Sequence, residues 1–163
     1  AHRLSRRQAI WWGCLCIEQD RGESLSATES AALDAALTWV LEPNDAHRRA
    51  AGVAAKAAEM KTPSGSLAKP VFWSGGSLSR PEYPQVPPPP HICACAVASA
   101  VLLLAASYPK DELRQQKRKG FLDLAAQIDQ GDLGWEEPGI VVERSARADS
   151  APSASTEVVE VSA

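Results

Sequence analysis

The feature that most constrains the fold is a stretch rich in glycine and proline, residues 73–91, which reads WSGGSLSRPEYPQVPPPPH. Two adjacent glycines suit the end of a helix, because glycine adopts positive φ at little cost and weakens a helix interior. The six prolines that follow lack a backbone N–H, so neither a helix nor a central strand can continue through them. We therefore expect a stiff connector of polyproline II type between two helical segments.

Three interpretations of this connector are open. Leu78, Tyr83 and Val86 could pin it across the surface of a helical bundle, and we favour this because the segment lies between two helices. Alternatively, residues 81–90 could be the ligand of a proline-binding groove in a partner protein. In the third interpretation the glycine pair is an anion-binding nest, which is the weakest because the residues after it do not open a helix.

Helical patterns flank the connector on both sides. The expected N-caps are Ser5, Ser26 (in a capping box with Glu29), Asn44 or Asp45, and Ser64. Pro109 begins a last helix, and Gly131 ends it. The sequence therefore predicts an all-α fold, a single compact bundle of about six helices that span roughly residues 6–19, 27–42, 46–59, 65–73, 92–106 and 109–130.

Two of the expected helices are apolar on every side, at residues 9–17 and 92–106. Helices of this kind are normally the buried centre of a domain. The longer run falls short of the ~20 residues that cross a bilayer, so we expect no membrane span. The shorter run follows Arg6 and Arg7, as in a twin-arginine export signal, but it is brief and ends at Glu18, so we do not expect export.

The third expected helix has an apolar and a charged set of residues. The apolar face is assigned to Ala46, Ala50, Val53, Ala54 and Ala57, and the solvated face to Asp45, Arg48, Arg49, Lys56 and Glu59. The His47-Arg48-Arg49 run could hold an anion. A solvated helix surface is the simpler interpretation, and we adopt it.

Charge divides the chain of 163 residues into two parts. Residues 1–131 carry 15 basic and 13 acidic side chains, whereas residues 132–163 carry 2 basic and 7 acidic ones. We expect a helical domain over 1–131 and an acidic, disordered tail over 132–163. We also expect that an N-terminal part is missing, because the chain starts at Ala1 rather than at methionine. A domain so close to neutrality lacks the strong basic patch of a nucleic-acid binder, so we expect no nucleic-acid partner.

The four cysteines occur as two pairs, Cys14-x-Cys16 and Cys93-x-Cys95. Both pairs fall in expected helices, where residues two apart point about 200° away from each other. The two thiols of a pair therefore cannot converge on one ion, and we expect no metal site and no cofactor. Buried free thiols fit a reducing compartment, so we expect a cytoplasmic protein.

The sequence contains none of the common catalytic or phosphate-binding strings. We therefore expect a non-catalytic protein-interaction module. The alternatives are a small enzyme or small-molecule binder, with a site near residues 73–77 and His91, and a structural subunit that assembles with itself. The candidate binding residues are Trp73, Ser74, Gly75, Gly76, Ser77, His91, Arg6 and Arg7.

Four separated motifs resemble those of an uncharacterised bacterial family, a domain of unknown function. They are RRQAIWWGCLC at 6–16, WVLEP at 39–43, RRAA at 48–51, and WSGGSL followed by PPPPH within 73–91, and the resemblance covers about residues 4–131. Some relatives are encoded near type VI secretion genes, so the resemblance implies an accessory or adaptor protein with a protein partner. No catalytic residue is established for the family, so the resemblance implies architecture rather than chemistry.

Overall fold

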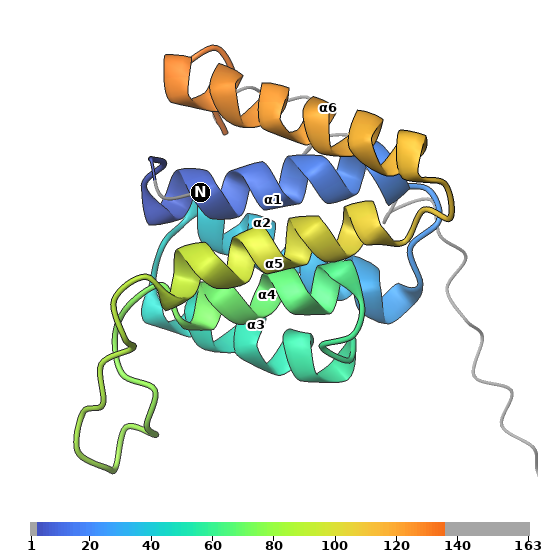
Figure 1. Ribbon diagram of the computed structural model, residues 1–163. Helices are drawn as coiled ribbons and strands as arrows, with labels where there is room; N and C mark the ends of the chain where they lie inside the picture. Colours follow the sequence, from blue (N-terminus) through green and yellow to red (C-terminus); the bar gives the residue numbers. More distant parts are fainter. Residues whose placement is uncertain (1–2, 136–163) are drawn as a thin grey trace, which may run out of the picture.

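The computed structural model describes residues 3–135, which form six α-helices and no strand (Figure 1). This confirms the predicted all-α bundle. None of the helices in this part of the chain is long and apolar enough to cross a membrane. The helices are α1 (Arg6–Arg21), α2 (Ala27–Leu41), α3 (Asp45–Ala57), α4 (Pro63–Phe72), α5 (Ile92–Ala106) and α6 (Asp111–Gln130).

Helix α1 is the centre of the bundle, as its apolar sequence predicts. Its residues 9–17 are all buried, and it packs against α2, α4, α5 and α6. Gly13 allows α4 to approach closely, because a Cβ there would lie 2.4 Å from a methyl carbon of Leu67. The Ser5 side chain caps the helix by accepting a hydrogen bond from the Gln8 N–H. Hydrophobic burial around all sides of α1 thus organises the domain.

The other helices form two groups around α1. Helices α2, α3 and α4 pack against one another on one side, and α5 packs against both α4 and α1. Helix α6 lies across α1 and α5 on the outside of the bundle (Figure 1). It is held there partly by Trp12, whose indole Nε1 donates to the Phe121 carbonyl oxygen at 2.6 Å.

Most helix ends match the predicted caps, and the start of α4 is the exception. Its N-cap is Thr62 rather than Ser64, because the Thr62 hydroxyl accepts from the Gly65 N–H at 3.1 Å. Pro63 takes the first helical position, where a missing N–H has no cost. Helix α6 begins at Asp111, two residues after Pro109, and ends as predicted at Gly131 with φ of 88°.

The predicted faces of α3 are wrong. Val53, assigned to the core, is 70% exposed, and Arg48, assigned to solvent, is only 3% exposed. The residues of α3 that are buried are Arg48, Ala51, Gly52 and Ala55. Apolar periodicity is weak in an alanine-rich helix. The orientation of α3 is set instead by its small residues, which permit close packing, and by the polar contacts of Arg48.

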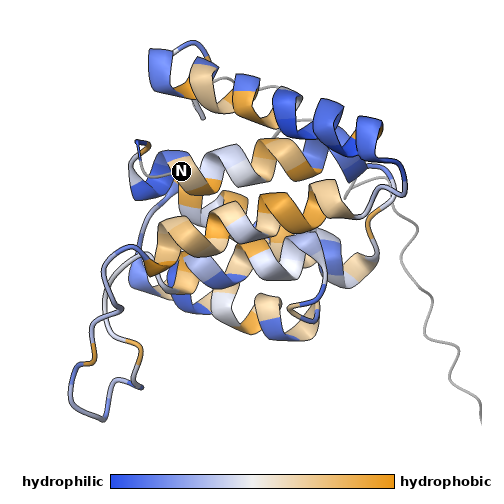
Figure 2. Cartoon of the chain, in the orientation of Figure 1, coloured by the Kyte–Doolittle hydropathy of each residue, from blue (hydrophilic) through white to orange (hydrophobic). Residues whose placement is uncertain are grey.

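Helix α5 is only half covered, although its sequence predicts a fully buried helix. Leu102 and Leu103 are 51% and 38% exposed, and Cys95, Ser99 and Ala106 are exposed on the same stripe. Figure 2 shows hydrophobic residues along α5 and hydrophilic ones over the first half of α6. The other side of α5 contacts α1, α4 and α6.

The division at residue 131 stays a prediction. Leu133 and Trp135, which follow α6, pack against the hydrophobic core. The rest of the predicted acidic tail, residues 136–163, lies outside the described residues.

Candidate functional site

The glycine turn, residues 73–77, follows α4 and is held by Arg48 of α3. Arg48 donates from Nη1 to the Phe72 carbonyl oxygen at 2.6 Å and from Nη2 to the Ser77 carbonyl oxygen at 3.0 Å. Its guanidinium also lies 2.6 Å from a carboxylate oxygen of Asp45. A buried guanidinium is tolerated only when its donors are satisfied. Here Asp45 and the two carbonyl groups at either end of the turn accept from the guanidinium, so the arginine fixes the turn between them.

Two more arginines hold the same segment from outside. Arg6 of α1 donates to the Ser74 carbonyl oxygen at 2.9 Å, and Arg49 of α3 donates to the Ser79 carbonyl oxygen at 3.2 Å. Gly76 is needed within the turn because its φ is +62° and a Cβ there would lie 3.1 Å from the Arg48 guanidinium. Side chains from α1 and α3 thus set the path of the backbone.

The connector loop, residues 78–86, projects from the bundle (Figure 1). The Leu78 N–H donates to the Val86 carbonyl oxygen at 2.8 Å and closes the loop. The Ser77 hydroxyl accepts from the Val86 N–H at 3.0 Å, and the Ser79 hydroxyl donates to the Pro84 carbonyl oxygen at 2.6 Å.

The expectation that Leu78, Tyr83 and Val86 pin the connector across the bundle surface is therefore wrong for two of these residues, and only Leu78 is partly buried. Tyr83 is 60% exposed and Val86 is 50% exposed, so neither is an anchor. Hydrogen bonds within the loop fix its shape instead, and they leave both side chains free to face solvent.

The structure brings only part of the predicted binding residues together. Trp73 ends α4 and its ring lies 5.4 Å from Lys69 Nζ, next to the turn that Arg6 contacts. Arg7 is used elsewhere: it donates to the Val40 carbonyl oxygen at the end of α2, at 2.6 Å. Its guanidinium also lies over the Trp135 ring. His91 is exposed and precedes α5 with a φ of 69°.

A hollow of about 380 Å³, here called the basic cavity, opens between α3, α4 and the start of the connector loop. Its polar lining consists of cations from three separate segments, and no acidic residue of the part of the chain that the structure describes lines it. Its apolar lining comes from the same elements. The lining residues are Arg49, Lys56, Lys69 and Arg80, with Gly52, Val53, Phe72 and Leu78.

Little in the sequence indicates this cavity. The Arg48-Arg49 pair could be recognised, because Asp45 lies three residues before one arginine and four before the other. On one helix this spacing predicts ion pairs between Asp45 and both arginines. The other three cations could not be recognised in the sequence, because Lys56, Lys69 and Arg80 are isolated along the chain. They meet only when α3, α4 and the start of the connector loop come together.

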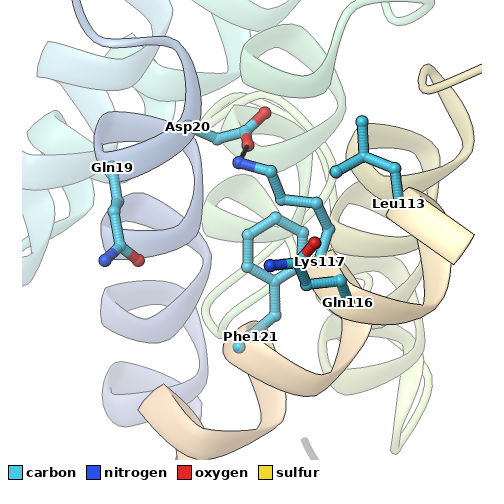
Figure 3. A pocket seen from close by; sticks show the side chains of 7 residues that line it. Gln19, Asp20, Leu113, Gln116, Lys117 and Phe121 are labelled. Carbon is cyan, nitrogen blue, oxygen red and sulfur yellow. Dashed lines mark ion pairs between the residues drawn. The ribbon is translucent and has the colours of Figure 1, made fainter.

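A second hollow, of about 310 Å³, lies between α1 and α6 (Figure 3). The Asp20 side chain is 1% exposed and accepts hydrogen bonds from Lys117 Nζ and from the Tyr108 hydroxyl, both at 2.6 Å. The hydrogen bond to Asp20 raises the pKa of Lys117. A lysine kept protonated in this way is not a nucleophile, so these residues form a joint between α1 and α6 rather than a reactive site.

The cysteines lie on two helices. Cys14, Cys16 and Cys93 are buried, and Cys95 is exposed. Burial raises the pKa of the Cys93 thiol to about 11 and raises that of Cys16 as well, so both thiols stay protonated near neutral pH. Within residues 3–135, no three His, Cys, Asp or Glu side chains are grouped so that they could hold a metal ion.

Comparison with known proteins gives one finding. Neither the curated proteins nor the solved structures contain a match to this chain. A family model described as a family of unknown function, DUF6931, matches residues 1–129. This match spans α1 to α5 and nearly all of α6, including the glycine turn and the basic cavity. The chain therefore belongs to the DUF6931 family, a family of unknown function.

Proposed function

We propose that this domain is a non-catalytic protein-interaction module and that the connector loop is the element that contacts the partner. The observation that carries the proposal is a loop that is both exposed and fixed in shape. Tyr83 and Val86 face solvent, while the Ser77 hydroxyl accepts from the Val86 N–H and the Ser79 hydroxyl donates to the Pro84 carbonyl oxygen, which holds the two sides of the loop together. A preformed loop loses little conformational entropy when it binds.

The chemistry of the loop indicates the kind of groove that would receive it. Pro84, Tyr83 and Val86 are followed by four consecutive prolines, of which three are exposed. Proline-rich segments with an aromatic residue dock into aromatic-lined grooves, because their extended conformation exists before binding. We infer a partner protein with such a groove.

The cellular setting is part of the same proposal. It includes a role as an accessory protein of type VI secretion, which rests only on the family resemblance of the sequence motifs. Buried, unreactive thiols at Cys16 and Cys93 support action in the cytoplasm.

The test compares the wild-type chain with two double variants in pull-downs from the native host. Tyr83→Ala with Val86→Ala alters the loop, and Met60→Ala with Leu122→Ala alters two other exposed hydrophobic residues. We expect a partner to be recovered with the wild type and the control, and lost with the loop variant. A photocrosslinking residue at Tyr83 should join the same partner covalently.

Circular dichroism melts establish that all variants fold alike. Recovery of the partner with the loop variant, or no partner with any chain, would refute the proposed function.

A further inference from the structure

The charges in the basic cavity indicate a ligand site, whether or not the connector loop binds a partner protein. Its four cations differ in how their charges are compensated. Arg49 lies 2.7 Å from a carboxylate oxygen of Asp45, and Arg80 lies 4.0 Å from one of Glu82. Within the described residues, Lys56 and Lys69 have no acidic partner. Two positive charges in the cavity are therefore uncompensated.

Lys69 is placed as a ligand-binding cation would be. It is half-buried, and its ammonium lies 5.3 Å from the centre of the Phe72 ring and 5.4 Å from that of Trp73. Partial burial and the positive charge of Lys56 lower the pKa of Lys69. An anion between the two ammonium groups would remove this repulsion, and it would replace the water that Lys69 has lost.

The cavity also offers apolar surface beside these charges. Phe72 and Leu78 line it from α4 and the connector loop, and Val53 lines it from α3. Ligand sites typically combine such apolar walls with a few charged groups, and their volumes run from roughly 300 to 1,000 Å³. At about 380 Å³, the basic cavity is of a size for one small molecule.

We propose that the basic cavity binds a small phosphomonoester that has an aromatic or aliphatic body. A phosphomonoester carries close to two negative charges at neutral pH, which match the two uncompensated lysines. The phosphate would lie between Lys56 and Lys69, and the body would lie against Val53, Phe72 and Leu78. Because Leu78 and Arg80 belong to the connector loop, the ligand would contact the base of that loop.

Isothermal titration calorimetry at low salt with four probes tests this proposal. The probes are phenyl phosphate, inorganic phosphate, phenyl sulfate and phenol. Phenyl phosphate should bind with one-to-one stoichiometry and about tenfold more tightly than the other three, because only it has both the dianion and the apolar body. Equal affinity for phenyl sulfate would overturn the requirement for a dianion, and no binding of phenyl phosphate would overturn the site.

Matched variants locate the binding. Lys56→Gln and Lys69→Gln should each weaken phenyl phosphate by about tenfold, because each removes a charge-assisted contact. Lys119→Gln makes the same charge change on the exposed surface of α6 and should bind like the wild type. Since Lys69 is half-buried, Lys56→Gln supplies the decisive comparison if Lys69→Gln lowers stability.

Val53→Trp distinguishes binding of the apolar body of the ligand from binding of its phosphate. Val53 is 70% exposed at the cavity, so the larger side chain can be accommodated without disturbing the core. It should weaken phenyl phosphate strongly and inorganic phosphate little. Unchanged binding in both Lys56→Gln and Val53→Trp would place the ligand elsewhere and refute the proposal. None of these outcomes depends on whether the connector loop binds a protein.

Discussion

Arg48 Nη2 donates to the Ser77 carbonyl oxygen at 3.0 Å, which joins the first turn of α3 to the far end of the glycine turn. The same guanidinium holds the Phe72 carbonyl oxygen at the end of α4. Both ends of the turn therefore depend on one side chain that is 3% exposed.

Replacing Arg48 by methionine should destabilise the domain by about 3 kcal/mol, because two backbone carbonyl groups lose their donor. Urea denaturation followed by far-ultraviolet circular dichroism measures the change in the free energy of unfolding. Arg118→Met, on the exposed surface of α6, is the control and should change it by less than about 0.5 kcal/mol. A loss in Arg48→Met no larger than in the control would show that the turn holds its shape without the arginine.

The two neighbouring glycines of the turn should differ in their tolerance of a side chain. Gly76→Ala should cost about 1 kcal/mol or more, because φ is +62° and the new Cβ would lie 3.1 Å from Arg48. Gly75→Ala is the matched control: its Cβ would meet nothing within 4 Å, and its φ is not positive. Thermal melts of the two variants compare them, and equal melting temperatures would contradict the required conformation at Gly76.

Asp45 should make the free energy of unfolding of the domain depend on pH in the acid range. Hydrogen bonds from Arg49 and then Arg48 lower the pKa of this carboxyl below its ordinary value of 3.8. Because the pKa is lower in the folded state, the Asp45 carboxylate contributes fully to the free energy of unfolding at pH values well above 3.8. This contribution is lost as the pH falls through the pKa of the folded state. Asp45→Asn should therefore be less stable than the wild type at pH 6, and the difference should shrink at pH 3.

Urea titrations at both pH values measure this difference, with Asp123→Asn of α6 as an exposed control. A difference that is constant with pH would assign the effect of Asp45 to hydrogen bonding rather than to its charge. The effect should be modest, because the Asp45 side chain is 59% exposed and solvent screens its interactions.

The ion pair between α1 and α6 should respond asymmetrically to removal of its two partners. Lys117→Met removes the cation that is hydrogen-bonded to the buried Asp20 carboxylate, and only Arg21, whose Nε lies 3.6 Å from it, remains. This change should cost about 2 kcal/mol. Asp20→Asn should cost less, because the Lys117 side chain is 34% exposed and can turn to water. Equal costs in urea denaturation would indicate that both side chains are equally solvated.

The four thiols should react at different rates. N-ethylmaleimide should modify Cys95 in the folded protein, and should modify Cys14, Cys16 and Cys93 only after denaturation, because burial shields them and raises the pKa of Cys16 and Cys93. Peptide mass spectrometry after timed labelling measures the four rates. Rapid labelling of Cys16 in the folded state would show that α1 opens to solvent.

Sequence reasoning predicted the features that are encoded locally. The capping box at Ser26, the unbroken apolar run of α1 and the helix end at Gly131 each depend on residues within a few positions of one another. Such patterns fix where helices begin and end, and whether a helix is apolar on every side.

The orientation of α3 and the connector could not be predicted in this way. Burial of Arg48 depends on one carbonyl oxygen at the end of α4 and one in the glycine turn, 24 and 29 residues later in the chain. The exposure of Tyr83 depends on two hydrogen bonds across the loop, one accepted by the Ser77 hydroxyl and one donated by the Ser79 hydroxyl. Neither set of contacts leaves a periodic pattern in the sequence.

The bond between the Leu78 N–H and the Val86 carbonyl oxygen has a consequence for loop-closure entropy. It divides the long connection between α4 and α5 into a closed ring and two short limbs, so the helices are joined as if by a much shorter chain. Loop-closure entropy grows only slowly with the number of residues in a ring. The tip of the ring can therefore lengthen or shorten at little entropic cost, while the limbs keep α4 and α5 in the same relative position.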